Sequence, residues 1–247
     1  MEGTSQYSRW HRYFDERAGE PLDAPFDEPL PEDAPGRAAI ARSLERFELG
    51  ESGDGERLRR LAHETGDATY AEAIELFVKE ENAHARWLGV LRERFGGTKL
   101  TGHWSDHAFV LLRHVGALRF EICVLLSAEV TALTYYRVLG DSHPDPVLRA
   151  ACKRILLDER GHVAFHRATL GREFSSLRGL QRRAAALAWR AFVVATATVV
   201  AIDHRGVLKL AGVSRREFVG DVRRRARTLA RVMYRPGAFE QPAALRG

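Results

Sequence analysis

One pattern occurs twice in this chain and restricts its fold more than any other feature. A glutamate is followed thirty residues later by Glu-x-x-His, first as Glu51, Glu81 and His84, and again as Glu129, Glu159 and His162. With 10 histidines in 247 residues, a single Glu-x-x-His arises about once by chance. Two copies, each preceded by a glutamate at the same interval, indicate that the six residues act together.

Apolar side chains recur around each copy in steps of three and four. This spacing predicts four helices that turn the six polar groups into the core of a bundle. The apolar positions are Ile40, Leu44 and Phe47; Tyr70, Ile74, Phe77, Leu88 and Leu91; Leu111, Val115, Leu118, Ile122, Leu125, Ala132 and Tyr136; and Leu148, Cys152 and Ile155. In each predicted hairpin the paired glutamates lie about equally far from the intervening turn, so they stand at one height.

Buried carboxylates and imidazoles are costly unless they are paired, hydrogen-bonded or bound to metal. Four carboxylates can bridge two cations while each imidazole caps one, which suits two iron ions, with a Mn/Fe or Mn/Mn pair as the alternative. A structural zinc site would more often use cysteine. A core held by ion pairs without metal is the competing interpretation.

The order Glu, Glu-x-x-His, Glu, Glu-x-x-His resembles the ferritin-like di-iron carboxylate superfamily, which includes rubrerythrins, bacterioferritins, ribonucleotide reductase small subunits and acyl-carrier desaturases. The resemblance covers about residues 36–172. It implies an all-α, ferritin-like four-helix bundle and a homodimer. It also implies six metal ligands, with Glu81 and Glu159 as bridges: Glu51, Glu81, His84, Glu129, Glu159 and His162.

Three further residues are expected to support the ligands rather than bind metal. Glu80 and Asp158 directly precede the two motifs and are similar to the acids that orient a histidine in this superfamily. His166 lies one turn beyond His162, about 6 Å further along the helix axis, which places it in the pocket wall or against a ligand.

Glycine crowds the first ligand. Gly50, Gly53 and Gly55 surround Glu51, so the first helix is expected to bend or stop there, and Glu48 is the alternative ligand. The linker of residues 96–107 must run the length of the bundle if the second and third helices are parallel, as the resemblance implies. Twelve extended residues reach at most about 40 Å, so the third helix is expected to start a turn later than its apolar pattern.

The leading functional hypothesis is an oxidase or oxygenase that uses O2 or peroxide to oxidise a small organic substrate. Leu125, Ala128, Ala132 and Tyr135 are expected near the site, and Tyr136 is either an oxidisable catalytic residue or a packing tyrosine. The alternatives are a ferroxidase or peroxide-scavenging rubrerythrin-like protein, an RNA-modifying hydroxylase, and a helical interaction module with a vestigial site. The residues do not identify the electron donor.

The flanking segments differ in charge. Residues 1–35 hold five of the nine prolines and predict an acidic, loop-rich arm with no secretory leader. Tyr7, Trp10 and Phe14 are its candidate anchors, and a solvated tail is the alternative interpretation. Residues 1–171 carry 22 basic and 28 acidic side chains, whereas residues 172–247 carry 16 and 5. The basic part, residues 173–247, predicts helices over 180–202 and 214–234, and the three arginines of the first make it too charged for a membrane span.

The two cysteines, Cys123 and Cys152, are predicted to lie about 20 Å apart along antiparallel helices, too far for a disulfide. Reduced core thiols fit a cytoplasmic protein. The arginines of residues 223–227 indicate a face exposed to solvent. The alternative is that this face binds nucleic acid, an acidic carrier protein or anionic lipid.

Overall fold

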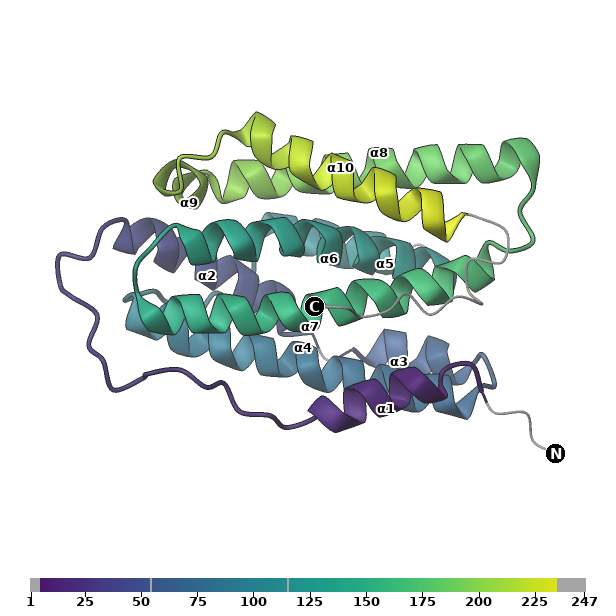
Figure 1. Cartoon of the computed structure of the whole chain (residues 1–247), viewed down its shortest axis with the longest axis horizontal. Helices are drawn as coiled ribbons and strands as arrows, with labels where there is room; N and C mark the ends of the chain where they lie inside the picture. Colours follow the sequence, from purple (N-terminus) through teal and green to yellow (C-terminus); the bar gives the residue numbers. More distant parts are fainter. Residues whose placement is uncertain (1–4, 54, 115, 235–247) are drawn as a thin grey trace. The chain divides into compact units, whose positions relative to one another are not determined.

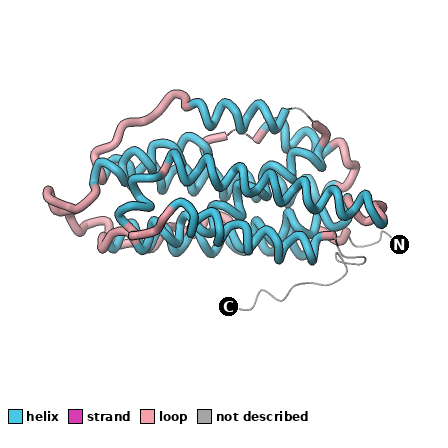
Figure 2. The backbone as a smooth tube through the Cα atoms, turned by 90° about the horizontal axis from the view of Figure 1, so that it is seen from above, coloured by secondary structure: helices cyan, strands magenta, loops and turns pink. Residues whose placement is uncertain are grey.

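The structure is a computed structural model that describes residues 5–53, 55–114 and 116–234. Within these residues every regular element is a helix (Figures 1 and 2), so the all-α prediction is confirmed. The ferritin-like topology stays a prediction. The helices are α1 (Ser8–Arg17), α2 (Arg37–Glu51), α3 (Glu56–His63), α4 (Ala68–Arg94), α5 (Trp104–His114), α6 (Leu118–Asp141), α7 (Pro146–Glu173), α8 (Gly179–Asp203), α9 (Arg205–Leu210) and α10 (Arg215–Met233).

The chain divides into two compact units. The first comprises Met1–Glu121 with Pro144–Arg154, and the second comprises Ile122–His143 with Ile155–Gly247. Helices α6 and α7 therefore each contribute residues to both units.

The first unit is built around α4, against which α1, α2 and α3 pack. The apolar faces predicted for α2 and α4 are buried, with Ile40, Leu44, Ile74, Phe77 and Leu88 all inaccessible or nearly so. Since each apolar contact removes surface from water, this shared face stabilises the unit.

The predicted break near Glu51 is confirmed, because α2 ends at that residue and α3 begins after Gly55. Gly55 has φ of 66°, in the left-handed region. A β-carbon there would lie 2.8 Å from both methyl groups of Val78 on α4. Only glycine allows this close approach, so the turn places Glu51 at the free end of α2.

The N-terminal arm is more regular than predicted, because residues 8–17 form α1. Its three predicted anchors are buried as expected. Tyr7 packs on Tyr70 with ring centroids 4.5 Å apart, and Phe14 packs on Phe77 at 6.3 Å. The arm is therefore attached along α4.

The third long helix starts later than its apolar pattern, as expected, but the end of the linker before it is helical. Residues 104–114 form α5, and α6 begins only at Leu118, about two turns after the apolar pattern starts. Leu111, predicted to lie in the core, is on α5 with 68% of its surface exposed; Val115 lies outside the described residues. A helical linker was missed because its apolar residues continued the rhythm of the next helix.

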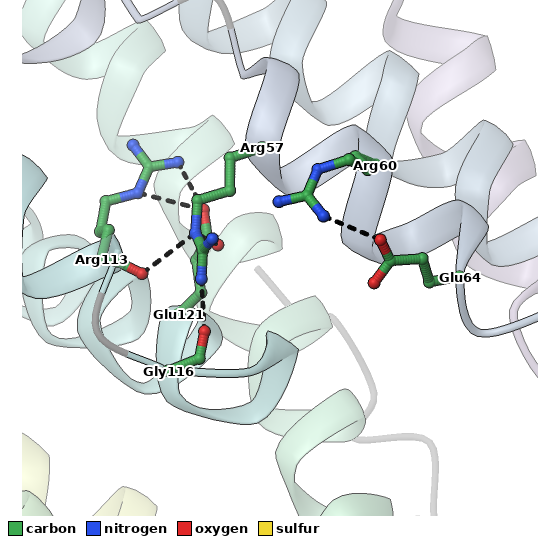
Figure 3. Close-up of polar contacts among 6 residues, drawn as sticks. All are labelled: Arg57, Arg60, Glu64, Arg113, Gly116 and Glu121. Carbon is green, nitrogen blue, oxygen red and sulfur yellow. Dashed lines mark hydrogen bonds and ion pairs between the residues drawn. The ribbon is translucent and has the colours of Figure 1, made fainter.

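The junction between α5 and α6 is held by a buried carboxylate. Glu121 is completely buried, and Arg57 of α3 and Arg113 of α5 contact it at 2.9 and 2.8 Å. Arg57 also donates to the backbone carbonyls of Arg113 and Gly116 (Figure 3). These bonds connect three helices around one negative charge.

In the second unit α8 and α10 pack against one another. Their bounds confirm the helices predicted over 180–202 and 214–234. The indole Nε1 of Trp189 donates to the carbonyl of Cys123 on α6 at 3.2 Å. Helix α10 begins with a capping box in which Ser214 and Glu217 bond each other's backbone N–H groups. Both cysteines are free thiols, as predicted.

Among the residues that the structure describes, two helices are long and apolar enough to cross a membrane by length and composition. They are Leu118–Asp141, with 83% of its most apolar window buried, and Gly179–Asp203, with 22% buried. The burial of the first helix indicates that it is a core helix, since core helices can be equally long and apolar. Most residues of the apolar window of the second helix are half-buried or exposed.

Candidate metal centre

The first Glu–His cluster lies where α2 ends beside the middle of α4. Glu51, Glu81 and His84 each offer one ligand atom, and these atoms all lie within 4.8 Å of one another. His84 is fully buried, its Nδ1 lies 3.9 Å from Oε1 of Glu81, and both carboxylates are half-buried. The helical spacing of Glu81 and His84, together with the turn after Glu51, produces this cluster.

The alternative ligand, Glu48, has another partner. Its carboxylate accepts a hydrogen bond from Nε of Arg92 at 2.5 Å, and both side chains are buried. The hydrogen bond from Arg92 to Glu48 raises the pKa of Arg92. The structure therefore brings Glu51, and not Glu48, to Glu81 and His84.

An aromatic and charged layer lies next to this cluster. The ring of Trp87, one turn after His84, has its centroid 5.6 Å from the imidazole, and the Arg154 guanidinium lies 5.6 Å from the Trp87 ring. Arg154 in turn bonds Glu20 of the N-terminal arm at 2.5 Å. Sequence reasoning missed Trp87 and Arg154, although the three-residue spacing from His84 could have identified the tryptophan.

Glu80 is buried, as expected for an acid beside the motif. Its Oε1 lies 3.6 Å from Nε of Arg17 on α1. That Glu80 orients His84 stays a prediction.

The second Glu–His cluster lies on α6 and α7 within the second unit. Glu129, Glu159, His162 and His166 are all buried. Nδ1 of His162 lies 3.4 Å from Glu129 and 3.9 Å from Glu159. Nε2 of His166 lies 3.4 Å from the other oxygen of Glu129. Each oxygen of the Glu129 carboxylate thus faces one imidazole.

This arrangement controls the charge of Glu129. Burial alone would raise the pKa of the Glu129 carboxyl, but the imidazoles of His162 and His166 lower it further than burial raises it, so that it lies well below its usual range. A carboxylate that remains ionised in a buried site is a suitable ligand for a cation.

The remaining predicted residues are also buried. Asp158 is completely inaccessible, and Tyr136 packs edge-on against Tyr135 with ring centroids 5.7 Å apart. Leu125 and Ala132 are buried on α6, and Ala128 is half-buried. A role for Tyr136 beyond packing stays a prediction.

The donor sets fit hard or borderline cations. The first cluster supplies two carboxylates and one imidazole. The second supplies two carboxylates, Glu129 and Glu159, and the imidazoles of His162 and His166. Neither cysteine thiol is among these donors. Carboxylate with imidazole suits iron and manganese, whereas structural zinc sites are usually rich in thiolate. The first cluster therefore has the geometry to hold a metal ion, and the second gathers donors of the same kind.

The chain matches no model of a known protein family, no curated protein and no solved structure. Its function is therefore inferred from the chemistry of the two clusters.

Proposed function

We propose that this chain is a non-haem di-iron protein that uses O2 to oxidise a small organic substrate. The observation that carries the proposal is the repeated donor set of two carboxylates and one imidazole in buried or half-buried positions. Such groups are costly in a core unless a cation neutralises them.

Each cluster would hold one ion. Glu51, Glu81 and His84 would bind the first, and Glu129, Glu159 and His162 the second. Manganese could replace iron at either position. The bound iron would supply one-electron chemistry toward O2 or peroxide. That the two ions act as a pair follows the resemblance noted from the sequence.

The surrounding residues support a reaction that is shielded from water. His84 and His162 are fully buried, and the ring of Trp87 lies beside His84. His166 faces the carboxylate of Glu129, where its imidazole can hold or return a proton. Shielding favours oxidation of a bound organic molecule over the leakage of reactive oxygen species.

The first experiment measures metal content. Protein reconstituted with Fe(II) under nitrogen should contain about two ions per chain by mass spectrometry, because two donor sets are present. His84→Ala and His162→Ala should each remove about one ion. His63→Ala, which changes an exposed histidine of α3, is the matched control. Unchanged stoichiometry in both cluster variants would contradict metal binding.

The second experiment tests the pairing and the reaction. Mössbauer spectra of the oxidised protein should show magnetically coupled ferric ions, whereas two uncoupled ions would contradict a di-iron centre. Stopped-flow mixing with O2 should then oxidise the reduced protein. Ala132→Leu should lower the turnover of an organic substrate while the iron content stays unchanged, because it fills space three residues from Glu129.

Two outcomes would replace the proposed reaction. If iron mineral is the only product across a broad panel of organic substrates, the protein is a ferroxidase. If the loaded and reduced protein consumes neither O2 nor peroxide, every redox function proposed from this site is wrong.

A further inference from the structure

Helix α8 carries an apolar stripe that faces solvent. Leu180 is 81% exposed and Leu187 is 64% exposed, and Ile202 also belongs to the exposed residues. Small exposed residues continue the stripe between these larger ones in steps of three and four: Ala184, Ala191, Ala195 and Thr198. The mean hydropathy of the most apolar window of α8 is 1.9, and only 22% of that window is buried. Exposed apolar helix faces of this length mark interaction surfaces.

The opposite face of α8 is already occupied. Trp189, Val193, Ala197 and Ala201 are buried, and α10 packs against α8. Trp189 is further fixed by its bond to the carbonyl of Cys123. Since one face packs within the unit and the other is exposed, α8 is positioned as a surface helix rather than as an isolated membrane span.

The same helix pair exposes an excess of positive charge. The exposed arginines of α10 are Arg215, Arg216, Arg223, Arg224, Arg227 and Arg231. The acids of α10 do not neutralise this charge. Asp221 is shared among Arg137, Arg224 and Arg225, and Glu217 belongs to the capping box. A helix pair that exposes both an apolar stripe and unneutralised arginines suits a partner that is both apolar and anionic.

A second copy of the chain fits this surface poorly. Arg190 lies next to the middle of the stripe, because residue 191 is halfway between Leu180 and Ile202. If two copies paired through α8, their Arg190 side chains would lie next to each other. This holds for both an antiparallel and a parallel pair of helices. Like charges at such a contact are repulsive. Nucleic acid would satisfy the arginines but leave the apolar stripe in water.

We propose that α8 and α10 form a docking surface for anionic phospholipid bilayers. The apolar stripe of α8 enters the boundary between headgroups and acyl chains, with the helix axis along the membrane plane. Arg183 is exposed and borders the stripe, where its long side chain reaches the lipid phosphates. The arginines of α10 add electrostatic attraction. The docking does not depend on the proposed iron chemistry.

Vesicle flotation with the full-length protein tests this proposal. The protein should float with vesicles of phosphatidylcholine and phosphatidylglycerol and remain unbound with phosphatidylcholine alone. Leu187→Glu should reduce binding at least about tenfold, because the variant loses the burial of one leucine in the bilayer. Val90→Glu, at an exposed apolar residue of α4, is the matched control and should bind like the unchanged protein.

A second pair of variants tests the arginines. Arg223→Gln with Arg227→Gln should weaken binding about 30-fold, since each arginine near an anionic surface contributes about fivefold. Arg42→Gln with Arg149→Gln removes the same charge from exposed positions elsewhere and should have a much smaller effect. Circular dichroism establishes that all variants fold.

Three results would overturn the proposal. The first is an absence of binding to both kinds of vesicle. The second is binding that Leu187→Glu leaves unchanged. The third is a dimer that forms without vesicles and dissociates on Leu187→Glu, which would assign the stripe to a second copy.

Discussion

Replacing Glu121 by glutamine should destabilise the protein strongly. Glu121 is fully buried and contacts the guanidinium groups of Arg57 and Arg113 at 2.9 and 2.8 Å (Figure 3). Glutamine has a similar shape but no charge. The substitution would leave two neighbouring arginines, each with only 19% of its side chain exposed, without the anion that holds them.

The magnitude follows from burial. Removing one member of a buried ion pair costs about 3–5 kcal/mol, and partial exposure of the arginines places this case near about 3 kcal/mol. The same figure shows a control with the same geometry, since Arg60 and Glu64 are also 2.8 Å apart but have side chains that are 58% and 55% exposed. Glu64→Gln should therefore cost less than about 0.5 kcal/mol.

Urea denaturation followed by circular dichroism and tryptophan fluorescence measures both free energies of unfolding. Arg113→Gln added to Glu121→Gln should have little further effect, because the contact between these two side chains is already lost. If Glu121→Gln and Glu64→Gln cost the same within about 0.5 kcal/mol, burial does not determine the strength of these ion pairs and the argument is refuted.

Three further sets of substitutions test the choice of metal ligand, an ion pair of α10 and the cap of α10. Glu51→Gln should lower the iron content with little loss of stability, whereas Glu48→Gln should retain iron but lower the denaturation midpoint; the opposite result would make Glu48 the ligand. Burial raises the pKa of Asp221, but Arg225 and other partners lower it below its ordinary value, so its stabilising effect is present above pH about 4 and is lost as the pH falls through the folded pKa. Asp221→Asn should therefore flatten the acid side of a plot of Tm against pH, and an unchanged slope would contradict this. Ser214→Ala should cost about 1 kcal/mol through loss of the α10 cap, and a normal thermal melt would exclude a capping contribution.

The sequence by itself determined the features that depend on local spacing. The three-and-four repeat placed Glu81 with His84, and Glu159 with His162, on single helix faces, and α4 and α7 contain these motifs as predicted. The glycines after Glu51 predicted the end of α2. The apolar repeats of α8 and α10 also gave helices close to their observed bounds. These features were predictable because helical periodicity and glycine conformation act within a few residues.

Only the tertiary structure decided which side chains meet across helices. Glu48 and Glu51 lie one turn apart on α2, and no local rule distinguishes them; the packing of α4 brings Arg92 to Glu48 and His84 to Glu51. The apolar rhythm also ran through Leu111, although a separate helix places that residue in solvent. The contact of His166 with Glu129 likewise joins two helices. Such partners depend on contacts between residues far apart in the chain, which the periodicity of either segment alone does not contain.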